Sequence, residues 1–112
     1  MSGHTYYDPK DLEHFHEIRE HAPELGDKFF AYYSAVFEDG ALSAREKSLI
    51  ALGVAHAVQC PYCIEAYTKD SLSKGVDPEQ LTEVVHVATA IKGGAALVHG
   101  MQMKRIQDQV GM

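Results

Sequence analysis

Residues 46–67 read EKSLIALGVAHAVQCPYCIEAY, and this stretch decides the fold. Ser43, followed three residues later by Glu46, has the form of a capping box, which predicts a helix over about 44–58. Apolar residues occur on all sides of that helix. We therefore expect it to be buried on most of its faces.

The dipeptide Cys60-Pro61 ends this helix and opens another. Proline cannot continue a helix, but it fits the first turn of a new one, where its missing N–H is not needed. The sequence therefore predicts a helix over about 61–74 that ends before Gly75, with Cys60 at its N-cap.

The same punctuation by proline, glycine and capping residues divides the rest of the chain into helices, and no segment alternates like a strand. Asp8 is expected to cap the first helix, Gly40 to end the second, and Gly93-Gly94 to break or kink the helix that follows Asp77. The expected further helices cover about 9–21, 24–37, 78–91 and 95–109. We predict an all-α fold of about six helices in one domain, residues 1–112.

The helices over 44–58 and 78–91 are both apolar on nearly every face. A chain of 112 residues has too few other helices to cover both of them. We therefore expect neighbouring subunits to cover the remainder, as in a symmetric homo-oligomer.

Sixteen acidic and ten basic side chains give a formal charge of −6, and no cluster of lysine and arginine occurs. Nucleic acid is therefore not an expected partner, because phosphate binding needs a basic face. No uninterrupted apolar run approaches the roughly 20 residues of a membrane span, so no membrane is expected. The first residues lack the basic start and apolar stretch of a signal peptide, which predicts a cytoplasmic setting.

Cys60 and Cys63 are the two cysteines of the chain. A Cys-x-x-Cys pair can close into a disulfide and reopen when one sulfur is readily a thiolate. The free N–H groups and positive dipole at the start of the 61–74 helix favour that thiolate. Zinc binding and inert packing are alternatives, but no second Cys-x-x-Cys or His pair follows at the spacing of a zinc finger, so no metal is expected.

His56, four residues before Cys60, shares a face with it if the helix continues that far, and it is a candidate base. A hydrogen-bonded core histidine is the alternative. Glu46 could complete a proton relay, although ten residues of straight helix separate it from His56 by roughly 15 Å and its capping role already explains it. Tyr67, four residues after Cys63, could donate to a thiolate or an oxygen species, or simply pack. His86 and His99 are interpreted as structural.

These residues resemble a known family. The 46–67 stretch, Gly75, the apolar helix over 84–91 and Gly93-Gly94 together resemble the core of the carboxymuconolactone decarboxylase/alkylhydroperoxidase D-like family. The resemblance covers about 22–104, with 1–21 as an N-terminal helical extension. Within the family, CPYCIEAYTK and the later VHG are similar to the peroxidase-like proteins associated with arsenosugar biosynthesis.

The resemblance implies an all-helical fold that assembles as a trimer or a hexamer. For members with the cysteine pair it also implies peroxide reduction through a disulfide, and so nominates Cys60 and Cys63 as the redox couple. The family pattern has a glutamate twelve residues before the first cysteine and a histidine four after the second. Here these positions hold Ser48 and Tyr67. The resemblance extends to a different branch of the family, which uses a histidine just upstream of the cysteines, and this implies His56 with Glu46 as the candidates for proton transfer.

We therefore predict a thiol-dependent peroxidase or disulfide reductase whose catalytic residues are Cys60, Cys63, His56 and Glu46. Its substrate would be a small peroxide or disulfide, and an external dithiol would reduce it without any bound cofactor. Two alternatives are a lyase of the carboxymuconolactone decarboxylase type and a non-catalytic zinc-binding or assembly module.

Overall fold

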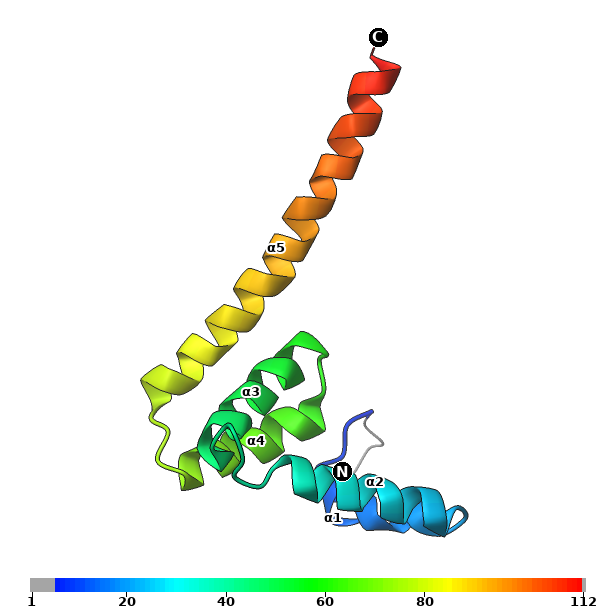
Figure 1. Cartoon of the computed structure of the whole chain (residues 1–112), viewed down its shortest axis with the longest axis vertical. Coiled ribbons are helices and arrows are strands. Elements are labelled where there is room, and N and C mark those ends of the chain that lie inside the picture. Colours follow the sequence, from blue (N-terminus) through cyan, green and yellow to red (C-terminus); the bar gives the residue numbers. More distant parts are fainter. Residues whose placement is uncertain (1–5, 112) are drawn as a thin grey trace, which may run out of the picture.

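Helices make up most of residues 6–111, the part of the chain that this computed structural model describes, and no strand occurs among them. Helix α3 packs against both α4 and α5, while the short N-terminal elements lie beside α2 (Figure 1). The all-α prediction is confirmed. The elements are α1 (Lys10–Glu13), the 3-10 helix η1 (Phe15–Arg19), α2 (Pro23–Val36), α3 (Ala44–Ala57), α4 (Pro61–Ser73) and α5 (Pro78–Val110).

The capping box at the start of α3 forms as predicted. The Ser43 side chain accepts a 3.0 Å hydrogen bond from the Glu46 backbone N–H, and the Glu46 carboxylate accepts a 2.8 Å bond from the Ser43 N–H. Two otherwise unpaired backbone donors are thereby satisfied. Leu52 and Ala55, further along α3, are buried against the rest of the chain.

Helix α4 ends as predicted at Ser73, followed by Lys74 and Gly75. Gly75 has a φ of +83°, a left-handed conformation that glycine adopts without steric cost. A second capping box then starts α5, in which the Asp77 side chain accepts from the Gln80 backbone and the Gln80 side chain accepts from Asp77.

The expected break at Gly93-Gly94 is wrong. Helix α5 runs without interruption from Pro78 to Val110, and it extends well beyond the other helices (Figure 1). A glycine inside a helix costs only about 1 kcal/mol relative to alanine, and the surrounding alanine, leucine and lysine residues are good helix formers. A Cβ built at either glycine would meet nothing within 4 Å, so no contact within the chain forces a bend there.

The single N-terminal helix expected over 9–21 is also wrong. The segment divides at His14 into α1 and η1, neither of which has a buried residue. Short polar helices without a packed apolar face are marginally stable, so nothing holds this segment in one α-helix. The N-cap of α1 is Pro9 and not Asp8 as expected, although the Asp8 side chain accepts a 3.0 Å hydrogen bond from the Lys10 N–H.

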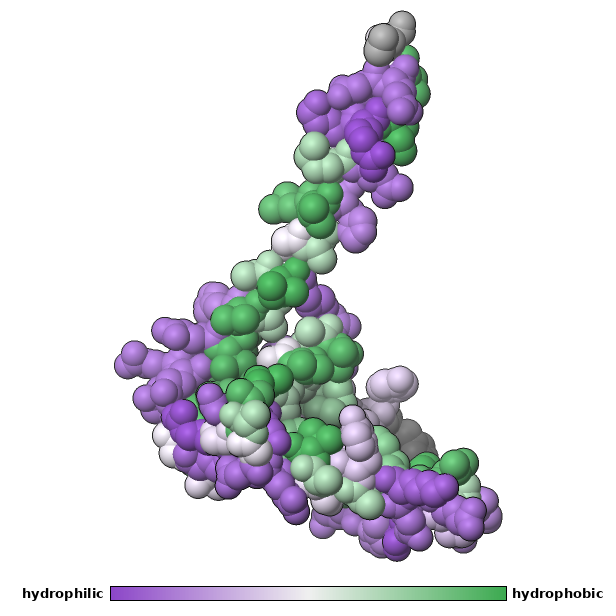
Figure 2. Space-filling view, viewed as in Figure 1, coloured by the Kyte–Doolittle hydropathy of each residue, from purple (hydrophilic) through white to green (hydrophobic). Residues whose placement is uncertain are grey.

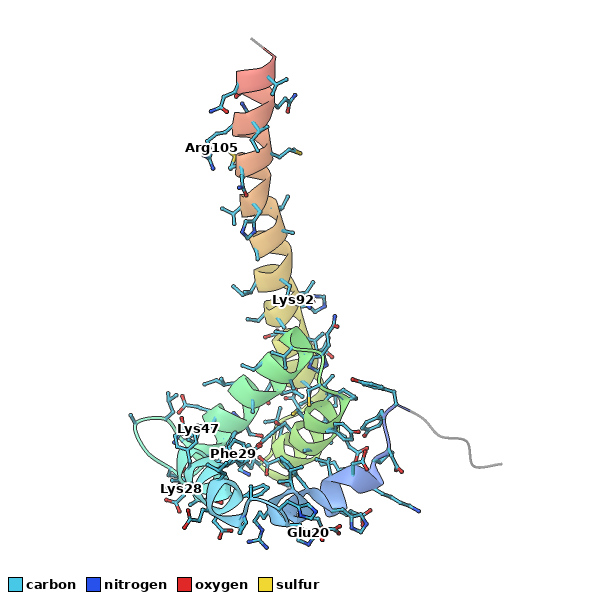
Figure 3. All side chains as sticks on the ribbon, turned by 90° about the vertical axis from the view of Figure 1, so that its right-hand side faces the viewer. Glu20, Lys28, Phe29, Lys47, Lys92 and Arg105 are labelled. Atoms are coloured by element: carbon cyan, nitrogen blue, oxygen red, sulfur yellow. The ribbon has the colours of Figure 1, made fainter. Side chains whose placement is uncertain are left out.

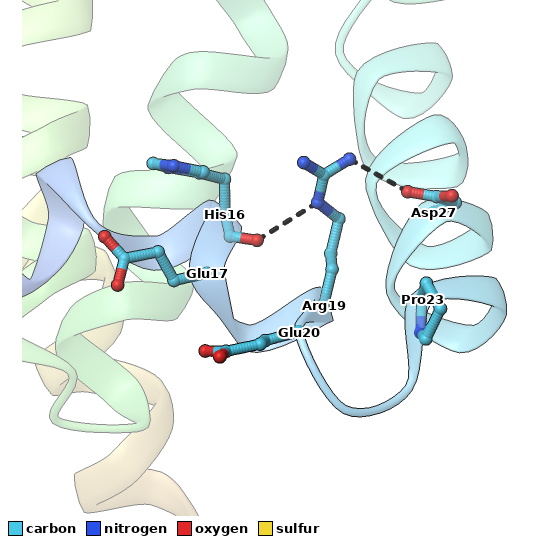
Figure 4. A pocket seen from close by; sticks show the side chains of 6 residues that line it. All are labelled: His16, Glu17, Arg19, Glu20, Pro23 and Asp27. Carbon is cyan, nitrogen blue, oxygen red and sulfur yellow. Dashed lines mark hydrogen bonds and ion pairs between the residues drawn. The ribbon is translucent and has the colours of Figure 1, made fainter.

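Arg19 joins η1 to α2. Its guanidinium donates to the carbonyl oxygen of His16 at 3.1 Å and to Asp27 at 2.9 Å, along one wall of a polar surface cavity (Figure 4). Gly26 permits this approach, because a Cβ at that position would lie 2.5 Å from Cγ of Arg19. The connection fixes where the N-terminal segment meets α2.

Helix α2 begins at Pro23 and ends at Val36, within one residue of the prediction. Gly40 does not cap it, contrary to expectation. The C-cap is instead Phe37, whose backbone N–H bonds to the Tyr33 carbonyl oxygen, while the Glu38 N–H bonds to Ala35. The Gly40 N–H bonds to the Leu42 carbonyl oxygen. Phe37 can end the helix with ordinary negative dihedral angles, so no glycine is needed there.

The chain by itself has almost no core. Among the described residues, the buried apolar side chains are Leu52, Ala55, Val76 and Ala88. The radius of gyration is 19.2 Å, against about 13 Å for a compact chain of this length. Apolar surface follows α3 and much of α5, while the outer end of α5 is polar (Figure 2).

By length and composition alone, α5 is also apolar enough to cross a membrane, with a mean hydropathy of 1.3 over an 18-residue stretch. The sequence argument expected no span because no uninterrupted apolar run approaches roughly 20 residues, whereas the whole helix meets the criterion on length and average composition. Lys92 lies near the middle of α5 (Figure 3), with His86 and His99 on either side of it in the sequence. Ionisable side chains of this kind are costly in lipid.

Candidate active site

Cys60 is the N-cap of α4, as the sequence predicted. Helix α3 ends at Ala57, and Gln59 turns the chain back with a φ of 57° before α4 begins at Pro61. The Cys60 N–H is held by the carbonyl oxygen of Ala55 at 3.0 Å. Its Sγ accepts a 3.3 Å hydrogen bond from the backbone N–H of Cys63, so a thiolate there faces a helix N-terminus.

Cys63 lies one helical turn further on and keeps its proton more strongly. Burial, hydrogen bonding to the Cys60 side chain and the negative charge of a Cys60 thiolate raise the pKa of Cys63 from 9.0 to about 11. Both cysteines are free thiols and both are partly buried. The raised pKa favours Cys63 as the thiol of the pair, beside a Cys60 sulfur that faces the N-terminus of α4.

Both sulfur-bearing residues border a cavity of about 520 Å³ between the N-terminal segment, α2 and α4. Its walls are mostly aromatic, contributed by Phe15, Phe29, Phe30, Tyr33, Tyr62 and Tyr67. Edge-to-face contacts hold these rings, such as Phe15 on Phe30 with centroids 5.0 Å apart. The cavity offers an apolar molecule a place directly beside the thiols.

Cys63 also borders a second apolar cavity of about 450 Å³ between α2, α3 and α4. Tyr33 of α2 and Tyr67 of α4 line both cavities, and their hydroxyl groups are hydrogen-bonded to each other. Tyr67 was a candidate from the sequence because it follows Cys63 by one turn. The structure places it in the site.

His56 lies one residue before the end of α3. Its Nδ1 is 2.9 Å from the Leu52 carbonyl oxygen, and since a carbonyl only accepts, Nδ1 carries the proton and Nε2 is left as the basic nitrogen. The condition for sharing a face with Cys60 is not met, because the helix ends at Ala57. His56 does not line either cavity that Cys63 borders, so its catalytic role stays a prediction.

Glu46 lies at the opposite end of α3 from His56, where Ser43 holds its carboxylate. These hydrogen bonds lower the pKa of Glu46, as expected for a carboxylate at a helix N-terminus. Its capping role is thus confirmed, and a part in proton transfer stays a prediction. Ser48, at the position where the resembling family has a glutamate, is buried and bonds to the Ser71 hydroxyl at 2.9 Å.

His86 and His99 are exposed on α5 and line neither of the two cavities. The residue that the sequence argument missed is Tyr33. It stands in an aromatic run, and nothing local distinguishes its hydroxyl from that of Tyr32. Its partner Tyr67 is 34 residues away, so only the packing of α2 against α4 reveals the pair.

Within residues 6–111, no three or more histidine, cysteine, aspartate or glutamate side chains gather as a group that could hold a metal ion. The two cysteines are therefore the chemically distinctive groups of this site.

Comparison with known proteins gives consistent matches. Residues 23–103 match the carboxymuconolactone decarboxylase family. The chain is 37% identical over 102 residues to "Uncharacterized protein 4 in cox locus" of Paracoccus denitrificans, a match that covers 91% of this chain and 92% of that protein.

Two crystal structures are similar throughout most of their length. A protein from Methanobacterium thermoautotrophicum has a TM-score of 0.73 and 30% identity, covering 77% of this chain and 97% of its own. A carboxymuconolactone decarboxylase family protein from Legionella pneumophila has a TM-score of 0.68 and 33% identity, covering 81% and 82%.

Proposed function

The chain belongs to the carboxymuconolactone decarboxylase family, and from this premise we propose that it is a thiol-dependent peroxidase that reduces small hydroperoxides. Cys60 attacks the peroxide and Cys63 resolves the product. The observation that carries the proposal is the hydrogen bond from the Cys63 N–H to Cys60 Sγ at the start of α4, on the wall of an apolar cavity.

The order of the two cysteines follows from their electrostatics. A thiolate is the nucleophile in thiol chemistry, and the first turn of α4 stabilises it at Cys60. The raised pKa of Cys63 keeps that residue as a thiol until Cys60 has reacted. Attack on the peroxide gives a sulfenic acid at Cys60, which condenses with Cys63 to a disulfide and water.

The aromatic cavity supports an organic hydroperoxide as the substrate. Its walls place apolar surface next to the sulfur, so an alkyl or aryl group can be buried there while the peroxide reaches Cys60. The cycle needs an external dithiol to reopen the disulfide and no bound cofactor. Reducing conditions, as in the cytoplasm, suit this cycle.

The test is thiol-dependent consumption of cumene hydroperoxide by the wild type and by Cys60→Ser, Cys63→Ser and the double variant. We expect Cys60→Ser to abolish consumption. Cys63→Ser should still react once, leaving a sulfenic acid that dimedone traps. Unchanged consumption in the double variant would refute the proposal, and a lyase activity surviving there would identify the chain as a decarboxylase-type enzyme instead.

We also propose that the working protein is a homo-oligomer, a trimer or a hexamer. One chain exposes 8882 Å² of surface, whereas a compact protein of 12.4 kDa exposes about 6,100 Å². The excess of roughly 2,800 Å² is of the size that obligate interfaces bury. A second copy of this chain is the expected occupant of that surface.

The apolar stripe of α5 supports this assembly. Val84, Val87, Ala88 and Ile91 border an apolar groove with α3. At the same helical spacing the stripe continues along the extended part of α5 as Ala95 and Val98, with Val98 64% exposed. The face of α5 that borders the groove with α3 is thus continuous with a face on the extended part of α5 that no other described helix covers.

A further inference from the structure

Two tyrosine hydroxyl groups meet at the wall that carries the cysteines. Tyr33 on α2 and Tyr67 on α4 are hydrogen-bonded to each other, and both line the two cavities that Cys63 borders. Most of the surrounding wall is apolar and aromatic. Tyr62 also lines the first cavity, but its hydroxyl donates to the Asp11 carboxylate at 2.7 Å. The Tyr33–Tyr67 pair is therefore the O–H source on the wall that both cavities share.

Ring packing fixes where these hydroxyls lie. The Tyr67 ring stacks on Phe37 with centroids 5.2 Å apart, and the Tyr33 ring contacts Phe37 at 5.0 Å and Phe29 at 5.7 Å. The neighbouring Tyr32 is 69% exposed and lines neither cavity. The Tyr33–Tyr67 pair thus has a defined position, which a proton donor in catalysis needs.

We propose that the Tyr33–Tyr67 hydroxyl pair donates the proton to the alkoxide that leaves when Cys60 attacks a hydroperoxide. This inference rests on the proposed peroxidase function. It assigns a catalytic role to Tyr33 and extends the role considered for Tyr67.

The step balances as follows. The Cys60 thiolate attacks the terminal oxygen of ROOH, so an S–O bond forms and the O–O bond breaks. The sulfur is oxidised by two electrons to the sulfenic acid, and RO⁻ leaves and takes a proton from the phenol pair as ROH. The resulting phenolate removes the proton of Cys63. That thiolate then attacks the Cys60 sulfur, and hydroxide leaves and is neutralised by solvent.

The environment of Tyr33 suits the donation of its proton to the alkoxide and the later removal of a proton from Cys63. Burial, followed by the charges of Cys63 and Cys60, raises the pKa of Tyr33 above 10.0. The phenol is therefore still protonated when Cys60 is a thiolate. Once it has given up its proton, the phenolate is a base on the same cavity wall as Cys63.

The experiment compares two oxidants that differ in their leaving group. Reduced protein is mixed with tert-butyl hydroperoxide or with peracetic acid, and remaining thiols are counted after rapid quenching. The tert-butoxide leaving group is strongly basic and needs a proton, whereas acetate is weakly basic and leaves without one. The variants are Tyr67→Phe and Tyr33→Phe, and Tyr32→Phe is the matched control.

We expect Tyr67→Phe and Tyr33→Phe each to slow oxidation by tert-butyl hydroperoxide by about tenfold to a hundredfold. This loss reaches the lower end of the rate enhancement that a general acid typically contributes. Their reaction with peracetic acid should stay within about threefold of the wild type. Tyr32→Phe should leave both rates unchanged. If one variant does not fold, the other decides the question.

Two results would overturn the proposal in folded variants. Equal losses with both oxidants would show that the rings only shape the site, and unchanged rates with tert-butyl hydroperoxide would show that the proton comes from elsewhere. A wild type that reacts with neither oxidant would instead refute the peroxidase function, and the inference with it. The two failures are therefore distinguishable.

Discussion

Cys60 Sγ accepts a hydrogen bond from the backbone N–H of Cys63, three residues further along the chain. The contact places the N-terminus of α4 against the Cys60 sulfur, which favours negative charge there. Burial, then hydrogen bonding to Cys60 and its charge, raises the pKa of Cys63. We therefore expect an order of reaction in which Cys60 precedes Cys63.

The first prediction concerns that order. At pH 8, iodoacetamide should label Cys60 well before Cys63, as peptide mass spectrometry can follow. In Cys60→Ser, the hydrogen bond and charge of Cys60 are gone, so the pKa of Cys63 should fall from about 11 towards 9.0. Burial remains and should hold it above 9.0. Faster labelling of Cys63 in the wild type would contradict the assignment.

The second prediction concerns the capping box of α3. Ser43→Ala should destabilise the protein by about 1 kcal/mol in urea unfolding, because one backbone donor loses its acceptor. Glu46→Gln should preserve stability, since glutamine also fits the box. A loss of peroxide reduction in stable Glu46→Gln would assign Glu46 a role in proton transfer beyond its cap.

The same box predicts a dependence on pH. The folded-state pKa of Glu46 is lowered by Ser43, so its stabilisation is fully present above the unfolded value near 4.5 and is lost as the pH falls through the lower folded value. The stability difference between wild type and Glu46→Ala should therefore shrink in acid. A difference that stays constant from neutral pH to well below 4.5 would contradict this.

The third prediction tests His56 as the base. If its free Nε2 accepts the Cys60 proton, His56→Ala should slow peroxide-driven thiol oxidation by about tenfold or more near neutral pH. At alkaline pH, where the thiolate forms without a base, the variant should approach the wild-type rate. His99→Ala is the matched control, because His99 Nδ1 is likewise bonded to its own helix, at Ala95. Equal rates at every pH would remove His56 from the mechanism.

The fourth prediction concerns assembly. Val98→Glu places a charge on the uncovered apolar stripe of α5, and sedimentation should show a shift from a trimer or hexamer towards the single chain. Gln107→Glu, on the polar outer part of the same helix, should sediment like the wild type. A monomeric wild type would contradict the proposal, and a wild type that partitions into detergent or vesicles would indicate lipid as the partner of α5.

Local signals explain which parts of the fold were predictable. The box of Ser43 and Glu46 and the Cys60-Pro61 start of α4 involve residues within three positions of each other, so the sequence alone reveals them. Cys60 was predicted as an N-cap for this reason, and its sulfur is found accepting the N–H of Cys63.

The errors have a common physical origin in packing. Gly93-Gly94 was read as a break because glycine weakens a helix, yet nothing in the chain pulls α5 aside at that point. Tyr33 was missed because its importance depends on Tyr67, which lies on another helix. The periodicity of a sequence does not show which hydroxyl groups on two different helices come together when the helices pack.

The left-handed backbone of Gln59 turns the chain between α3 and α4, and so fixes the position of α4 relative to α3. Inserting or deleting a single amino acid at this turn would break the hydrogen bond from the Cys60 N–H to the Ala55 carbonyl oxygen and shift the start of α4 relative to α3. A glycine at 59 would relieve the backbone there, whereas a β-branched side chain would strain it. The length of this turn and the left-handed backbone of Gln59 thus determine where the cysteine pair lies against the end of α3.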